Sequence, residues 1–202
     1  MGLSLITLNT KGLNQPAKRR KCMSFLKSKN CDVAFLQETH MKDQEHRRLG
    51  TGWVGKVYAS SGTSNSRGVA IIVNKHLPFK CIKKSADTLG RFISVLAEIQ
   101  GQTVILACVY APCVYDPDFF PSVENALYEL GTFPIVMAGD FNQHFGWITL
   151  EETGVDQMTL KLSKSFKREN LISLSYKITL RHFCCFGSVG LDLAYKNIRL
   201  CM

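Results

Sequence analysis

The chain has 202 residues, of which 46% are hydrophobic and 20% are charged. That length favours one domain, and the hydrophobic share excludes a mainly disordered, collagen-like or low-complexity chain. The formal net charge of +9 is uneven, because residues 1–91 carry +12, residues 92–160 carry −9 without any Lys or Arg, and residues 161–202 carry +6. A basic surface beside a carboxylate-rich middle suits binding of phosphates and of a divalent cation, and it is equally consistent with a solvated basic face.

Targeting signals and disulfides are not expected. No apolar run reaches the roughly 20 residues of a membrane span, and Met1–Leu8 lacks a basic flank and a cleavage site. The eight cysteines contain no C-x-x-C pair, and Cys31 and Cys108 lie inside apolar runs. We therefore expect buried, reduced thiols in an intracellular protein without a membrane segment, rather than a secreted disulfide framework.

The first part of the chain alternates between strands and one helix. Leu3–Asn9 is predicted to be a strand, and Pro16 begins a helix that continues to Lys29. This helix would bury a stripe of apolar side chains, namely Ala17, Cys22, Met23, Phe25 and Leu26. Short apolar runs between turn residues predict four more strands, at Asp32–Gln37, Trp53–Ala59, Gly68–Val73 and Phe79–Lys84.

A hairpin and a helix follow. Phe92–Ile99 and Thr103–Tyr110 would pair around a turn at Gly101-Gln102. Asp118–Leu130 is predicted to be a helix that Gly131 ends, and Phe133–Ala138 a buried strand broken by Gly139. After Gly146 the pattern weakens, with a helix expected at Leu160–Leu171 and strands at Leu174–Leu180 and Leu191–Tyr195. Many short strands with few helices predict an α/β layered fold with two sheets face to face.

Polar side chains stand where buried strands end, and these are the candidate site residues. They are Asn9, Glu38, Tyr110, Asp140 and Asn142. A carboxylate after an apolar strand is costly to bury without a partner, and two on one rim would suit Mg²⁺ or Mn²⁺. Taken singly, the Asp suits a turn, Asn9 an Asx-turn and Tyr110 a half-buried rim position.

The Asp-x-Asn pair has a mechanical interpretation. Residues two apart on an extended segment point the same way. Asp140 could then hold or deprotonate a water molecule while Asn142 donates hydrogen bonds to a phosphate oxygen. The Tyr110 hydroxyl could donate to the same phosphate.

As a set, these residues resemble the endonuclease/exonuclease/phosphatase superfamily, and more narrowly the endonuclease domain of LINE-type retrotransposons. The matching stretches are Ile6–Asn14 with Lys18–Lys21, Asp32–His40, Arg67–Ile71, Gly90–Phe92, Val109–Pro112 and Gly139–Gln143. The resemblance implies a four-layer α/β sandwich, with two mixed sheets packed face to face and helices outside. It implies one domain over residues 1–202, matched well over 3–145 and divergent over 146–202.

The resemblance also implies an activity, namely metal-assisted hydrolysis of a DNA phosphodiester that leaves a 3′-hydroxyl. Glu38 would be the principal metal ligand, with Asn9, Asp140 and Asn142 around the same Mg²⁺ or Mn²⁺ ion. Asp140 would orient or activate the attacking water, Asn142 would position it, and Tyr110 would contact the scissile phosphate. Relatives that cut at abasic sites or act as exodeoxyribonucleases share this chemistry, so we expect a nuclear protein whose partner is DNA, with no obligate protein partner.

The C-terminal part departs from the family pattern. Thr179 and Asp192 have a plausible spacing for two family positions, but the terminal Ser-Asp-His segment has no counterpart. The absent His would remove a contribution of roughly 10²–10⁴-fold to the rate, and the absent segment would leave an unpaired sheet edge or an unfilled core. The alternative histidines His40, His144 and His182 are more simply read as surface or satisfied residues.

Basic residues near the first strand are candidate phosphate contacts, namely Lys11, Arg19 and Arg20. A solvated helix face is the alternative explanation for Arg19 and Arg20, but phosphate contact is favoured. Two other functions therefore stay open. One is a catalytically dead fragment that binds DNA through its basic surface, and the other is a relative acting on another phosphoester, such as an RNA tail or a phosphoinositide.

Overall fold

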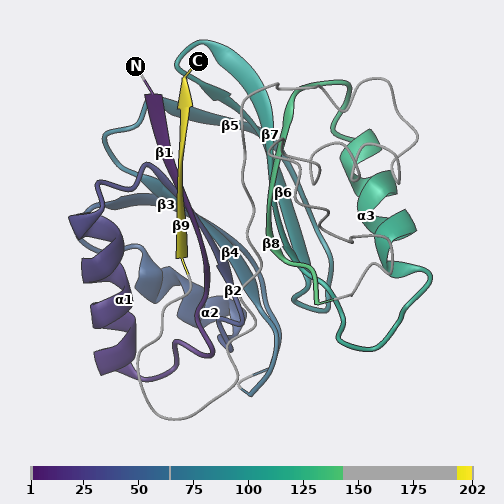
Figure 1. Cartoon of the computed structure of the whole chain (residues 1–202), viewed down its shortest axis with the longest axis horizontal. Helices are drawn as coiled ribbons and strands as arrows, with labels where there is room; N and C mark the ends of the chain where they lie inside the picture. The colour runs from purple at the N-terminus through teal and green to yellow at the C-terminus, as the bar shows by residue number, and fades with distance from the viewer. Residues whose placement is uncertain (1, 64, 143–194, 202) are drawn as a thin grey trace, which may run out of the picture.

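In the computed structural model, residues 2–63, 65–142 and 195–201 are described. Their strands form two sheets that face each other (Figure 1). Both sheets are mixed, because each contains one parallel pair among antiparallel neighbours.

The first sheet has five strands in the order β3-β4-β2-β1-β9. Their bounds are β1 Gly2–Asn9, β2 Val33–Gln37, β3 Val54–Ser60, β4 Val69–Asn74 and β9 Tyr195–Cys201. Its parallel pair is β1 with β2, in a register that sets Asn9 opposite Gln37.

The second sheet has four strands in the order β5-β6-β7-β8. Their bounds are β5 Phe79–Ala86, β6 Phe92–Ile99, β7 Gln102–Tyr110 and β8 Ile135–Asp140. Its parallel pair is β7 with β8, which sets Tyr110 opposite Asp140.

Helices cover the outer faces of both sheets (Figure 1). The helix α1 (Pro16–Ser28) and the short helix α2 (Asp43–His46) lie on the side of the five-stranded sheet, and α3 (Phe119–Tyr128) lies on the side of the four-stranded sheet. A 3₁₀ turn, η1 (Arg47–Leu49), continues α2. Among the described residues, no helix has the length and apolar character needed to cross a membrane.

Three separate apolar clusters hold these layers together, which confirms the predicted four-layer α/β sandwich. Alternation along β1 shows why, because Leu3 and Leu5 face the cluster between the sheets while Ile6 and Leu8 pack toward α1. The third cluster lies between the four-stranded sheet and α3. The strands β2, β4, β6 and β7 are thus buried on both faces, as their near-continuous apolar sequences require, whereas β5 is mostly exposed.

Some predicted boundaries are wrong. The hairpin turn is Gln100-Gly101, and both residues have positive φ (51° and 82°), as a two-residue turn of the right twist needs. Gly139 lies inside β8, where a Cβ would overlap the Val109 carbonyl of the paired strand. In α1, Ala17 is exposed and Phe25 is only half-buried.

The edge beside β1 also differs from expectation. Instead of being unpaired, β1 pairs antiparallel with residues 195–201 along nearly its whole length. The sequence analysis assigned a strand only as far as Tyr195, where β9 begins. The helix predicted at 160–171 and the strand at 174–180 lie outside the described residues.

Candidate active site

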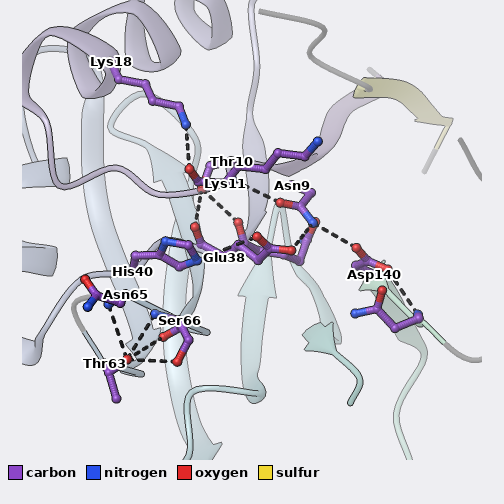
Figure 2. A network of polar contacts seen from close by, with 12 residues as sticks. Asn9, Thr10, Lys11, Lys18, Glu38, His40, Thr63, Asn65, Ser66 and Asp140 are labelled. Atoms are coloured by element: carbon purple, nitrogen blue, oxygen red, sulfur yellow. Dashed lines mark hydrogen bonds and ion pairs between the residues drawn. The ribbon is translucent and has the colours of Figure 1, made fainter. Parts of the chain in front are cut away.

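The candidate site lies where the two parallel strand pairs end, at the seam between the sheets. Asn9 ends β1 and Glu38 follows β2, whereas Tyr110 ends β7 and Asp140 ends β8. The Asn9 side chain spans the seam, because its Nδ2 donates to Glu38 Oε1 at 2.8 Å and to Asp140 Oδ2 at 2.9 Å. Figure 2 shows Asn9 between these two carboxylates.

Asn9 is also fixed from its other end. Its Oδ1 accepts a hydrogen bond from the Lys11 backbone N–H at 3.1 Å, which is the Asx-turn geometry. One amide therefore shapes its own loop and joins two carboxylates. Hydrogen bonds from this amide therefore hold the oxygen atoms of Glu38 and Asp140 on either side of it.

The segment that carries Glu38 is held by the backbone on both sides. Gly12 N–H donates to the Glu38 carbonyl at 2.7 Å, and Thr39 N–H donates to the Gly68 carbonyl at 3.0 Å. Glu38 and His40 have φ of 50° and 54°, which is unusual for residues with a Cβ. Such conformations persist only where the surroundings fix them, and they cluster at functional sites.

Thr39 anchors this segment to a buried histidine that the sequence analysis did not single out. Thr39 Oγ1 lies 2.9 Å from His46 Nε2, and Ser61 Oγ lies 3.0 Å from His46 Nδ1. Burial lowers the pKa of His46, so the ring is neutral and bridges two hydroxyl groups. Gly68 has φ of 92°, and a Cβ there would overlap Thr39 Oγ1.

His40 lies beside Glu38, with Nε2 3.7 Å from Glu38 Oε2. Burial lowers the pKa of His40, although the Glu38 carboxylate opposes this shift. A Cβ added to Gly12 would lie 2.9 Å from His40 Nδ1, so the glycine lets the first loop pack on the ring. His40 therefore packs against the loop that follows β1.

Tyr110 contributes a protonated phenol to the same rim. Burial raises the pKa of Tyr110 well above its usual range, and the carboxylates of Glu38 and Asp140 raise it further. A phenol in this environment donates hydrogen bonds at neutral pH and does not ionise.

Asp140 and Asn142 do not lie on one extended segment, and this corrects the geometry inferred from the sequence. Asn142 has φ of 38°, and its N–H donates to Asp140 Oδ1 at 3.1 Å. Its side-chain Nδ2 donates to the Ala111 carbonyl at 2.9 Å, which ties this turn to the segment after Tyr110. The predicted contact of the Asn142 side chain with phosphate stays a prediction.

The predicted phosphate-binding residues have different surroundings. Lys11 and Arg20 are exposed, whereas Arg19 donates to the Leu13 carbonyl at 2.8 Å and so braces the loop. Lys18 Nζ likewise donates to the Lys11 carbonyl at 2.6 Å (Figure 2). The described structure therefore leaves Lys11 and Arg20 better placed than Arg19 to meet a polyanion.

A buried polar group that the sequence analysis left unassigned lies under the site. Gln37 Nε2 donates to Thr7 Oγ1 at 3.2 Å and contacts Cys108 Sγ at 3.3 Å, which joins β2 to β7 across the sheets. The signal was a glutamine at the end of an otherwise apolar strand. Thr179 and Asp192, like His144 and His182, lie outside the described residues.

The donor set fits a hard divalent cation. Mg²⁺ is usually held by one or two carboxylates, with water and substrate phosphate completing its shell, and Glu38 and Asp140 supply two carboxylates around one amide. Within the described ranges, no group of three or more His, Cys, Asp or Glu side chains could hold a metal ion by itself. An ion here would therefore depend on water and phosphate ligands.

This arrangement defines a class of proteins, the four-layer α/β sandwiches whose oxygen-rich site lies at the seam between their sheets. Comparison with known sequences then settles the family. A sequence profile of the Endonuclease/Exonuclease/phosphatase family matches residues 6–155, and the chain belongs to that family.

One curated relative and two solved structures illustrate the similarity. The chain is 30% identical over 146 residues to the Transposon TX1 uncharacterized 149 kDa protein of Xenopus laevis, which covers 70% of the chain and 11% of that protein. D. rerio TDP2, solved with a single-strand DNA product, has a TM-score of 0.55 and 19% identity over 70% of this chain and 61% of that one. The endonuclease domain of TRAS1, a telomere-specific non-LTR retrotransposon, has a TM-score of 0.55 and 15% identity, and the match covers 73% of this chain and 64% of that domain. The chain thus spans about a tenth of the transposon protein and less than two thirds of either structure.

Proposed function

We propose that the chain is a divalent-metal-dependent DNA endonuclease that hydrolyses a phosphodiester and leaves a 3′-hydroxyl. The observation that supports this proposal is the Asn9 side chain bonded to both Glu38 and Asp140 across the sheet seam. Two carboxylates fixed beside a protonated phenol offer cation binding, proton transfer and a hydrogen-bond donor in one place. The transposon relative and the DNA named with the TDP2 structure favour DNA as the phosphoester.

Each side chain would have a separate task. Glu38, with Asp140 and the Asn9 and Asn142 amides nearby, would hold Mg²⁺ or Mn²⁺, which when bound offsets charge on the phosphate oxygens. Asp140 would accept the proton of the attacking water. Tyr110 would donate its hydroxyl to a non-bridging phosphate oxygen. The water oxygen bonds to phosphorus as the bond from phosphorus to the 3′-oxygen breaks, and that oxygen takes a proton from solvent.

Nicking of supercoiled plasmid DNA tests this proposal. We expect the chain to nick in Mg²⁺, EDTA to abolish nicking, and Asp140→Asn to slow it by roughly 10²–10⁴-fold, the usual contribution of a general base. Asp118→Asn is the matched control, because Asp118 is exposed and its side chain makes no capping bond at α3. Mg²⁺-dependent nicking that survives in Asp140→Asn would contradict the assignment.

Binding of DNA without cleavage is the second candidate function. The observation that favours it is the net charge of +12 over residues 1–91, with Lys11 exposed next to Asn9 and Arg20 exposed on α1. It predicts salt-sensitive DNA binding in EDTA and no nicking in Mg²⁺. Either function would place the chain where DNA is, which in a eukaryotic cell is chiefly the nucleus, and a transposable element is its proposed origin.

A further inference from the structure

An exposed apolar pair lies on the segment that leaves the candidate site. Val114 and Tyr115 are 80% and 78% exposed, whereas the other exposed large hydrophobic side chains among the described residues reach at most 52%. Isolated apolar side chains on a surface need no explanation, but two adjacent ones this exposed are a candidate contact surface for a ligand.

The pair is close to the site in space. Tyr115 is five residues after Tyr110, so its Cα lies within about 18 Å of that of Tyr110 even along a fully extended chain. Consecutive bases on one DNA strand are about 3.4 Å apart along the axis. If the phosphate of a DNA strand contacts Tyr110, a base within about five nucleotides of that phosphate can therefore reach Tyr115.

Both sides of this segment are fixed. On the Tyr110 side, Ala111 N–H donates to the Asp140 carbonyl at 2.8 Å, and the Ala111 carbonyl accepts from Asn142. Directly after Tyr115, Asp116 Oδ2 accepts from Arg91 at 2.8 Å, and that guanidinium also lies 4.8 Å from the centre of the Phe119 ring. The aromatic side chain is thus presented to solvent from a braced loop, at little further ordering cost on binding.

The charge around the pair indicates which part of a nucleic acid would meet it. Residues 92–142 contain no Lys or Arg, and Arg91, which contacts Asp116 directly after the pair, is itself held by the Asp116 and Asp87 carboxylates, whereas Lys11 is exposed on the Asn9 side. Asp116 is already paired with Arg91. A flat, uncharged aromatic surface opposite a basic one suits nucleobases, because every base has a π-face that stacks on an aromatic ring.

We propose that Val114 and Tyr115 form a base-contacting tip, in which the Tyr115 ring stacks on an unpaired nucleobase near the phosphate to be cut. This inference rests on the proposed action on DNA and specifies which side chain binds a base of the substrate. It implies a preference for sites where a base unstacks readily, such as single strands or flexible pyrimidine–purine steps.

Binding in EDTA tests the tip without cleavage. The probes are fluorescent dT20 and a 20-residue base-free deoxyribose phosphate oligomer, which carry the same phosphates and differ only in having bases. We expect wild type to bind dT20 more tightly, Tyr115→Ala to weaken dT20 binding by about 5- to 150-fold, and binding of the base-free oligomer to stay within about twofold. Tyr115→Phe keeps the ring and should bind dT20 like wild type.

Tyr128→Ala is the matched control, because Tyr128 is a second exposed tyrosine, at the last residue of α3, and this variant should leave both affinities unchanged. Equal affinity of wild type for the two probes overturns the proposal. So does unchanged dT20 binding by Tyr115→Ala, which a protein-binding role would produce, or an equal loss on both probes. Nicking by wild type alongside any of these results would leave the nuclease proposal intact, whereas a stacking signal without nicking would refute the nuclease alone.

Discussion

Gly68→Ala should destabilise the fold through one identified collision. Gly68 has φ of 92°, and a methyl group there would overlap Thr39 Oγ1. The left-handed backbone costs a residue with a Cβ roughly 1–2 kcal/mol. Overpacking adds typically 1–3 kcal/mol, so we expect the free energy of unfolding to fall by about 2–5 kcal/mol in total.

Gly101→Ala separates the two contributions. Gly101 has a similar φ of 82°, but nothing lies within 4 Å of a Cβ there. The free energy of unfolding of Gly101→Ala should therefore fall only by the cost of the left-handed backbone. Any stabilisation from the reduced conformational freedom of the unfolded chain is common to both variants. With a urea m-value of about 2 kcal/mol/M, the unfolding midpoints of the two variants should differ by roughly 0.5–1.5 M.

A double-mutant cycle completes the assay. Thr39→Ala removes the atom that the new methyl group meets, at the expense of the hydrogen bond to His46. In the double variant, the collision contribution of about 1–3 kcal/mol should vanish, so that the two effects are not additive. Equal midpoints for Gly68→Ala and Gly101→Ala, or additive effects in the cycle, would refute the reasoning.

Three further predictions concern ionisable groups. Tyr110→Phe should slow plasmid nicking by about 10²-fold, the usual loss for one donor to a developing anion, and because burial raises the pKa of Tyr110, the wild-type rate should show no loss from its ionisation between pH 7 and about 9. Burial lowers the pKa of His46 from 6.5, so the unfolded chain takes up a proton first and stability falls as pH drops below 6.5 until it passes the lowered native pKa. Urea titrations of His46→Gln should lack this component, and an unchanged pH slope would contradict it. Burial raises the pKa of the Cys22, Cys31 and Cys108 thiols to about 12. Iodoacetamide at pH 8 should therefore leave these three unmodified in the native chain while the exposed Cys81 and Cys113 react. Mass spectrometry of the alkylated chain checks this difference.

The layered fold could be predicted because its signals are local. The strands β2, β4 and β6 are continuous apolar runs between turn residues, and α1 begins at a proline and repeats its apolar residues at helical spacing. Strand-end reasoning also identified Asn9, Glu38 and Asp140, because parallel strands deliver their carboxyl ends to the same edge. The structure brings these three side chains into hydrogen-bond contact.

What the sequence did not reveal depends on contacts between distant segments. The pairing of β9 with β1 joins residues almost 200 positions apart, and no local pattern encodes that register. The helix α2 has four residues, too few for a periodic signal, so the buried His46 looked like any surface histidine. The left-handed turn at Asn142 was missed because Asp-x-Asn reads equally well as strand or turn.

The bridge across the sheet seam couples ligand binding to the cohesion of the whole molecule. A ligand that contacts Glu38 and Asp140 together binds only while the two sheets are docked, so mass action favours the docked state. At 100 times its dissociation constant, such a ligand adds about 2.7 kcal/mol to stability. Amide hydrogen exchange should then slow together in β1, β2, β7 and β8. Exchange rates in both sheets would therefore measure how much of the protein has ligand bound between Glu38 and Asp140.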